Sequence, residues 1–298
     1  MESRQAGIFR LCIIMGFFCV SIFFLNNNKK KFITATHIDV LTFKIDPTAT
    51  LSVEQVYEAM NSLFLAHDID LIVKALSQFK YHFAYDLIQK IIIDETICLS
   101  SEEKISIIYG MVAHCSAKKN VQYELLDFLI KYPALYTQTP ALLTLAKSKY
   151  ADNIGLFIAW GKDRHKDCPY FLMSCAEKAF TVAIEKNDYQ VVETLLSKKV
   201  RISRTKASAL LWYIVEHNKS SNLISLLVRH AQADVNYTQY GKTLLIAAVE
   251  KNNVEIIRVL LDAGAVVDRM SDVGTALMVA VRQKNQQVEH LLREYGAA

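Results

Sequence analysis

The residues best suited to bind a metal or to act as a nucleophile lie at positions 163–175. They are Asp163, His165 and Cys168, with Cys175 seven residues further on. Zinc prefers imidazole and thiolate ligands, usually in sets of four at characteristic spacings. This segment offers three such ligands, and their spacing matches no known zinc site. We therefore expect a charged loop followed by a buried cysteine.

Other histidines with acidic or thiol neighbours predict no catalytic site. His114 and Cys115 are adjacent, and adjacent residues on a helix point in different directions. The aspartates beside His67 have no partners in the sequence, and a helix boundary explains them. The chain has no HExxH or GxSxG motif, and its nine glycines are too dispersed for a phosphate-binding loop. The sequence predicts no catalytic residues, no metal and no cofactor.

The elements that carry these residues are predicted to be helical. Glycine and proline together supply 9 and 4 of the 298 residues, about 4% where an average chain has about 12%. A β-sandwich or barrel needs more of both for its turns. The 52% hydrophobic content excludes general disorder. We therefore expect an all-α chain.

The net charge of +4 belongs to the first 31 residues. They hold Arg4, Arg10 and Lys29–Lys31 against the single acidic residue Glu2. Subtracting these from the totals of 34 basic and 30 acidic residues leaves 29 of each in the rest of the chain. A neutral body has no overall field to attract nucleic acid, so no such partner is expected.

The same N-terminal segment contains an uncharged apolar run from Leu11 to Leu25. A membrane-spanning helix needs about 17–25 apolar residues, and Gly7–Phe9 would lengthen the run if Arg10 reached the membrane interface. Apolar side chains occupy every face of the expected helix, which suits lipid. We predict an uncleaved single-pass membrane anchor that includes Leu11, Ile14, Phe17, Phe18, Ile22, Phe23 and Phe24.

Two other interpretations of this run stay open, a cleaved signal peptide and a buried helix. A signal peptide would need a small-residue cleavage site, which does not follow Leu25, and Lys29–Lys31 would oppose translocation. The flanking charges place residues 32–298 on the cytoplasmic side by a margin of one charge. The scattered cysteines with no CxxC motif agree with a reducing compartment.

A pattern with a period of about 33 residues fills the C-terminal part of the chain. Residues 183–196 and 248–261 are identical at six of fourteen positions, with further copies between and after them. Each copy predicts two short antiparallel helices. In the third copy, Thr243 caps the first helix, and the second runs from Val254 to Asp262 and ends at Gly264. One such unit cannot bury its own apolar face, so the units must stack.

These residues resemble the ankyrin-repeat family. Residues 233–245 (ADVNYTQYGKTLL) are similar to that family's loop into its first helix, and residues 254–265 are similar to its second helix. The chain has Thr243-Leu244-Leu245-Ile246 where the family usually has Thr-Pro-Leu-His. The resemblance is strong over 233–298 and fair over 179–232. It implies an α-solenoid of helix-turn-helix repeats that binds partner proteins.

Degenerate copies extend the pattern over residues 103–178. Lys119-Asn120 lies 67 residues, or two periods, before Lys186-Asn187. Thr139-Pro140-Ala141-Leu142 has the family's Thr-Pro-x-Leu helix start. The predicted organisation is a membrane anchor at 1–31, a linker at 32–50, a helical cap or diverged repeats at 51–102, and ankyrin-like repeats at 103–298.

The resemblance implies that a partner contacts the concave face and the finger loops, the loops that lead into each first helix. Tyrosine and arginine dominate interface hot spots, and a basic run at 198–206 falls in one such loop. A solvated loop is the other interpretation of that run, and Trp212 is expected in the core. The candidate partner-binding residues are Arg201, Arg204, Lys206, Tyr237, Tyr240, Lys242 and Arg269.

These observations favour a non-catalytic scaffold for protein–protein interaction, held at a membrane by its N-terminal helix. One alternative is a secreted bacterial effector that binds a host protein at a host membrane, because the chain resembles ankyrin-like arrays of bacteria that live inside host cells. A second alternative is an enzyme with a divergent site in residues 32–178. No small-molecule substrate is expected, and the sequence does not identify the protein partner.

Overall fold

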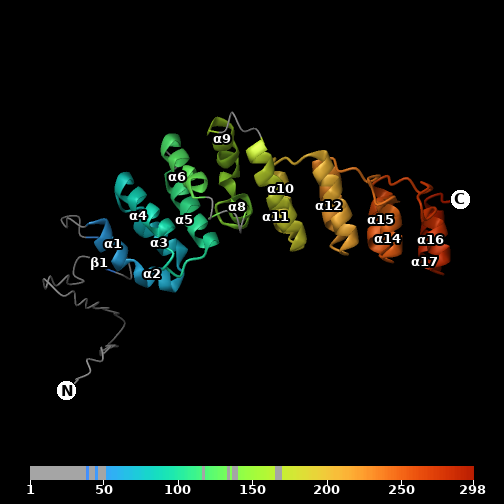
Figure 1. Cartoon of the computed structure of the whole chain (residues 1–298), viewed down its shortest axis with the longest axis horizontal. Coiled ribbons are helices and arrows are strands. Elements are labelled where there is room, and N and C mark those ends of the chain that lie inside the picture. Colours follow the sequence, from blue (N-terminus) through green and yellow to red (C-terminus); the bar gives the residue numbers. More distant parts are fainter. Residues whose placement is uncertain are drawn as a thin grey trace, which may run out of the picture. The chain divides into compact units, whose positions relative to one another are not determined.

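The computed structural model describes residues 38–39, 44–45, 52–115, 118–132, 135, 140–164 and 170–298 (Figure 1). The chain divides into two compact units between residues 132 and 133. The predicted membrane anchor at 1–31 lies outside the described residues. Among the helices that are described, none has both the length and the apolar character needed to cross a membrane.

The first unit is a set of helices preceded by a small hairpin. Strands β1 (Ile38–Asp39) and β2 (Lys44–Ile45) pair antiparallel, with Ile38 opposite Ile45. The helices are α1 (Val53–Ala59), α2 (Asn61–Ala66), α3 (Ile69–Leu76), α4 (Tyr81–Ile93), α5 (Ser101–His114) and α6 (Lys119–Lys131). At the start of this unit Val56, Tyr57, Met60 and Phe64 are buried.

A buried lysine joins α5 to the end of α4. Lys104 is 7% exposed, and its Nζ donates to the carbonyl oxygens of Ile92 at 3.1 Å and Asp94 at 2.8 Å. The last carbonyls of a helix lack helical partners and carry partial negative charge, so a cation suits this place. Burial lowers the pKa of Lys104. Hydrogen bonds from the hydroxyls of Thr96 and Tyr57 lower the pKa of the Asp94 carboxyl to about 2.

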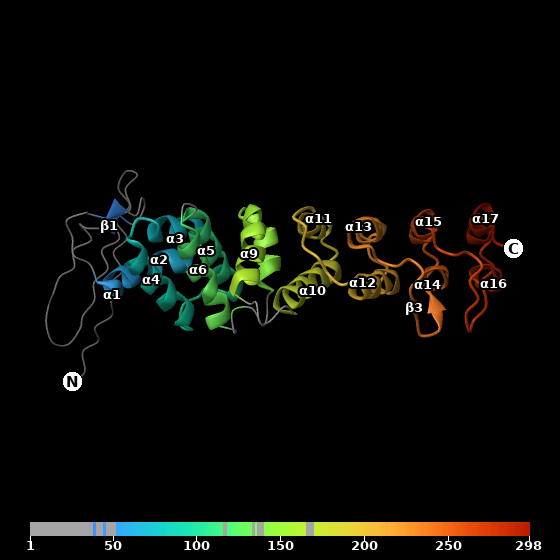
Figure 2. The same ribbon diagram turned by 90° about the horizontal axis from the view of Figure 1, so that it is seen from above.

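The second unit is a stack of helix pairs. It contains α8 (Ala141–Lys147), the 3-10 turn η2 (Ala151–Asn153), α9 (Ile154–Arg164), α10 (Tyr170–Glu185), α11 (Tyr189–Ser197), α12 (Arg204–Glu216), α13 (Ser221–Ala231), β3 (Thr238–Gln239), β4 (Lys242–Thr243), α14 (Leu244–Glu250), α15 (Val254–Asp262), α16 (Ala276–Arg282) and α17 (Gln286–Glu294). Figure 2 shows α10, α12, α14 and α16 in one row and α11, α13, α15 and α17 in another. The predicted helical repeat fold is confirmed here, with β3–β4 as a small hairpin.

The two helices of each repeat are joined by a turn of constant geometry. Its central residue has a positive φ of 50–57° at Asn187, Asn218, Asn252 and Lys284. In three of these repeats the side chain of the residue that caps the second helix accepts a backbone amide, as at Asn253, whose Oδ1 accepts from Ile256 at 2.9 Å. The cap of α13, Ser220, makes no such bond. Asparagine tolerates the left-handed region better than most residues, which explains its use in three of these four turns.

The turns of successive repeats are bonded to one another. The Asn187 side-chain oxygen accepts the backbone amide of Ser220 at 2.9 Å. The Asn218 side-chain oxygen likewise accepts from Asn253, and that of Asn252 accepts from Asn285. The donors Ser220, Asn253 and Asn285 are half-buried, whereas the three acceptor asparagines are exposed. These contacts link the turn of each repeat to the turn of the next.

The first unit contains the same turn between α2 and α3. His67 has a φ of 53°, and the Asp68 side chain accepts the amide of Leu71 at 3.0 Å. The backbone angles of Asp68, φ −88° and ψ 85°, match those of the cap residue Asp188, φ −89° and ψ 85°. The turn is thus of the repeat type, while the predicted domain boundaries at residues 50 and 102 stay predictions.

The second helices end in a left-handed residue. Gly264 has a φ of 89°, and the next amide, of Ala265, donates to the Leu260 carbonyl at 3.0 Å. This confirms the C-terminal cap expected at Gly264. Lys199 and Gln232 take the same place in earlier repeats with φ of 60° and 54°. Their side chains make the conformation costlier than it is for glycine.

Gly264 and Gly155 both have open space around them, so substitutions there measure backbone strain without a steric clash. An added Cβ meets nothing within 4 Å at Gly264 or at Gly155, but only Gly264 has a positive φ. We expect Gly264→Ala to lower the free energy of unfolding by about 1 kcal/mol. Gly155→Ala, within α9, should raise it by about 0.5 kcal/mol.

Denaturant titration followed by tryptophan fluorescence measures both effects, because Trp160 and Trp212 both lie in the second unit. Equal changes in the two variants would contradict the role assigned to the left-handed cap.

Candidate functional site

A groove of about 660 Å³ crosses the second unit where α12, the hairpin β3–β4 and α14 meet. We call it the aromatic groove. Its walls come from two successive first helices and from the finger loop between them. The lining residues are Ala209, Trp212, Tyr213, Glu216, His217, Gln239, Tyr240, Lys242, Ala247, Glu250 and Lys251.

The aromatic side chains form the side of this groove near α12. Trp212 is 8% exposed, which confirms its expected core position, and its remaining surface faces the groove. The Tyr240 ring meets it edge-on, with the ring centroids 6.2 Å apart. Tyr213 packs on His217 at 4.1 Å between centroids. The groove thus offers aromatic surface beside polar groups.

Tyr240 occupies an unusual backbone position at the tip of the hairpin. Thr238 pairs with Thr243 and Gln239 with Lys242, so Tyr240 and Gly241 alone form the turn. Both have positive φ, 52° and 70°, as a type I′ turn requires. Asparagine and glycine normally fill such turns, whereas Tyr240 carries a large ring that is 81% exposed. Backbone positions of this cost often occur at functional sites, so the conformation agrees with the choice of Tyr240 as a candidate.

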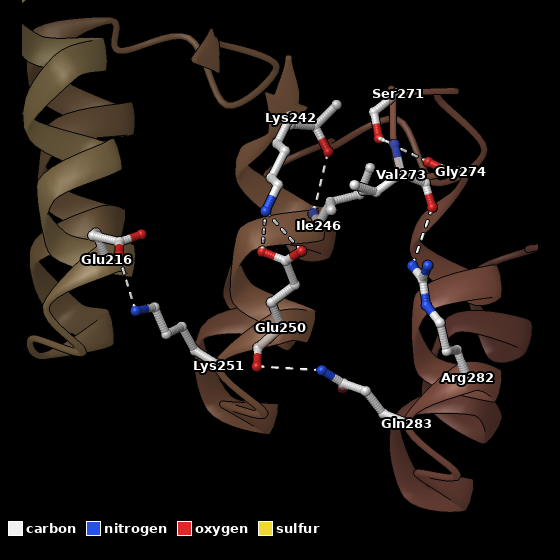
Figure 3. A network of polar contacts seen from close by, with 11 residues as sticks. Glu216, Lys242, Ile246, Glu250, Lys251, Ser271, Val273, Gly274, Arg282 and Gln283 are labelled. Carbon is white, nitrogen blue, oxygen red and sulfur yellow. Dashed lines mark hydrogen bonds and ion pairs between the residues drawn. The ribbon is translucent and has the colours of Figure 1, made fainter. Parts of the chain in front are cut away.

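The charged residues of the groove are paired among themselves (Figure 3). The Lys242 ammonium lies 2.8 Å from each carboxylate oxygen of Glu250. Lys251 reaches Glu216 of the preceding repeat at 2.9 Å. The aromatic groove is therefore electrically balanced, with two cations and two anions fixed at known places.

The next repeat is held against α14 from the other side. Figure 3 shows Gln283, the residue after α16, pointing to α14, and its Nε2 donates to the Glu250 carbonyl oxygen at 3.3 Å. Arg282 donates to the Val273 carbonyl oxygen at 3.1 Å and so fixes the loop that leads into α16. The Gln283 bond links the last repeat to α14.

On the last repeat, positions that are covered elsewhere are exposed. Met278 is 55% exposed, whereas Ile246, at the equivalent place in α14, is fully buried. In α17, Glu289 and Arg293 replace the buried Ile257 and Leu261 of α15 and pair with each other at 3.1 Å. The polar replacements leave the outer face of α17 exposed to solvent.

The structure brings together only some of the candidate residues. Tyr240 and Lys242 line the aromatic groove, and Tyr237 is half-buried in the same loop. Arg269 is exposed and donates to the Asn236 carbonyl oxygen at 3.1 Å.

The other basic candidates lie elsewhere. Arg204 is paired with Asp234 at 3.5 Å, and Lys206 is half-buried in the first turn of α12. Arg201 lines a different groove. A role in binding stays a prediction for all seven candidates.

Sequence reasoning did not single out Glu216, Glu250 and Lys251. Glu216 and Glu250 stand at the same place in successive repeats, in the last turn of the first helix. This recurrence could have identified the two glutamates from the sequence. Their pairing with lysines could not be predicted, because it depends on how two repeats are registered against each other.

The metal or thiol candidate is only partly described. His165 and Cys168 lie outside the described residues, and no group of three metal-binding side chains occurs within the described ones. Burial raises the pKa of the Cys175 thiol to about 11, so this thiol stays protonated and unreactive at neutral pH.

Comparison with known proteins places this unit among repeat proteins. A family model described as ankyrin repeats, in three copies, matches residues 172–272 and 211–298. The chain is also similar to BRCA1-associated RING domain protein 1 of Caenorhabditis elegans, with 30% identity over 128 residues. These residues make up 42% of this chain and 16% of that protein, so the chain spans a small part of that relative's length.

The two ion pairs of the groove are expected to differ in strength. Lys242 and Glu250 are each about two-thirds buried and bonded through both carboxylate oxygens, whereas Lys251 and Glu216 are more exposed and share one bond. A double-mutant cycle with Lys242→Met and Glu250→Gln should give a coupling of about 0.5–1 kcal/mol. The matched cycle at Lys251 and Glu216 should give about 0.3 kcal/mol or less.

Denaturant titrations at low and high salt measure both couplings. A larger coupling energy for the more exposed pair, Lys251 and Glu216, would contradict the stronger bonding assigned to Lys242 and Glu250.

Proposed function

We propose, on the premise that this chain belongs to the ankyrin-repeat family through residues 172–298, that it binds a partner protein in the aromatic groove. Ankyrin repeats support a role in protein–protein interaction. Which surface serves that role, and for which partner, is our inference from the site. We propose no catalytic activity.

The observation that carries the proposal is the exposed ring of Tyr240 at the tip of its hairpin. Aromatic anchors contribute most of the binding energy in many interfaces, because they bury a large area and lose little conformational freedom. Tyr240 already contacts Trp212 at the edge of a concave surface. A partner side chain entering the groove would cover both rings at once.

The fixed charges around the rings supply orientation. Glu216, Lys242, Glu250 and Lys251 present carboxylates and ammonium groups at set positions on both sides of the groove. Because each charge keeps a partner within the chain, an apolar group that enters leaves no charge unpaired. We infer that the groove accepts an aromatic or aliphatic side chain, with polar contacts at its rim.

We further infer that the apolar run from Leu11 to Leu25 holds the repeats at a membrane. This proposal rests on the sequence alone: the uncharged run, its basic flanks and its apolar residues on every face. The flanks favour the cytoplasmic side for the repeats. A secreted effector acting at a host membrane is the alternative, and a translocation assay distinguishes the two.

Replacing Tyr240 by asparagine tests the groove without disturbing the hairpin. Asn-Gly is the preferred type I′ turn, so Tyr240→Asn removes the ring while the turn keeps or gains stability. We expect partners identified by proximity labelling with the full chain to bind this variant at least tenfold more weakly. The control Val266→Asn removes another exposed apolar side chain, outside the groove, and should have no effect. Equal binding by both variants would refute the proposed role of Tyr240.

Removal of residues 1–31 tests the anchor separately. We expect the full chain in the membrane fraction and the shortened chain in the soluble fraction, with its partners retained. A full chain that is soluble and unchanged by the deletion would rule out the anchor.

A further inference from the structure

A second groove, of about 770 Å³, lies between α9, α10 and the loop at 198–203. We call it the basic groove. Its floor is apolar: Leu142, Phe157, Ala176 and Val200 are buried beneath it, and Ile158 and Met173 are half-buried. It shares no residue with the aromatic groove.

A glycine allows the two helices of this groove to approach closely. A Cβ at Gly161 of α9 would lie 2.4 Å from Leu172 Cδ2 of α10, closer than atoms can pack. On the opposite side, Val200 is buried and its amide donates to the Leu195 carbonyl oxygen at 3.0 Å. The loop at 198–203 is thus fixed at its centre, so the groove has defined walls.

Within the part of the chain that the structure describes, every charged residue that lines this groove is basic. They are Lys162, Lys198, Lys199 and Arg201. Lys198 is paired with Asp152 at 2.5 Å, whereas the other three side chains are exposed and make no ion pair within the described part of the chain. The aromatic groove, in comparison, has balanced charges. The excess of positive charge is confined to the basic groove, because residues 32–298 as a whole have equal numbers of basic and acidic side chains.

We propose that the basic groove docks a segment of a partner protein that carries both apolar and acidic side chains. The apolar floor gains from being covered by apolar groups, since this removes its surface from water. The unpaired cations at the rim attract carboxylates and disfavour basic segments. A flat membrane surface would meet the exposed rim but would not fill the recessed floor. The chemistry therefore fits an acidic amphipathic peptide better than a lipid headgroup.

The proposal is tested with the full chain and a short fluorescent peptide of alternating Glu-Glu and Leu-Leu pairs, measured by fluorescence anisotropy. The rim variant combines Lys162→Gln, Lys199→Asn and Arg201→Gln, where asparagine suits the positive φ of Lys199. The control removes as many exposed charges elsewhere, through Lys186→Gln, Arg229→Gln and Lys284→Asn, and Lys284 also has a positive φ.

We expect the rim variant to bind the peptide about tenfold more weakly than the unmodified chain, and the control variant to bind it equally well. Added salt should weaken binding to the unmodified chain and have a smaller effect on the rim variant. A peptide with glutamine in place of glutamate should bind weakly to all three proteins.

A variant of the floor provides an independent test if the rim variant loses helical content. Met173→Glu places a negative charge on the half-buried floor and should also weaken peptide binding about tenfold. Equal weakening by the rim and control variants would overturn the proposal. So would binding to phosphatidylserine vesicles that depends on the rim residues while the peptide does not bind, because the rim would then be a membrane contact.

Discussion

The burial of α14 on every side is the constraint on which the second unit depends. All residues from Leu244 to Val249 are buried, although a helix of a single repeat would expose half of its surface. A helix that is apolar all round must be enclosed by other elements. Here α12 and α16 flank it and α15 packs behind it. The small side chains of Ala247 and Ala248 allow these neighbours to lie close.

This enclosure explains why the aromatic groove has a fixed shape. The groove is the seam between α12 and α14, so its opposite walls cannot move apart without exposing the core beneath them. The asparagine bonds between successive turns hold one end of the seam, and the hairpin of Tyr240 closes the other. The ion pairs of Lys242 and Lys251 follow from this register and do not create it. Their expected coupling energies are small compared with the apolar burial.

The two grooves use the same architecture for different chemistry. In the aromatic groove, each lysine meets a glutamate that stands in the last turn of a first helix. In the basic groove, Lys199 and Arg201 of the loop at 198–203 and Lys162 of α9 have no such acidic partner among the described residues, whereas Lys198 is paired with Asp152. Because loops tolerate change better than the buried helices do, repeats of one fold can present neutral and basic surfaces side by side.

Local chemistry explains which features were predictable from the sequence. The period of 33 residues, the cap at Thr243 and the helix end at Gly264 were all predictable, since each depends on residues close together in the chain. The left-handed conformations of Lys199 and Gln232 were not, because neither side chain favours them, although each residue ends its helix in this conformation. The grooves were also beyond prediction. Tyr240 and Lys242 were selected from the loop that carries them, but Glu216 and Lys251 meet only after two repeats have stacked.

Hydrogen exchange resolved by mass spectrometry tests most directly whether stacking holds the binding face. If α14 is enclosed as described, its amides exchange only when the neighbouring repeats open with it. The amides of α12 and α14 should then share the slowest exchange in the second unit, and Gly264→Ala should speed both helices together. Exchange of α14 as fast as that of the loop at 265–275, or acceleration confined to the altered repeat, would contradict the account.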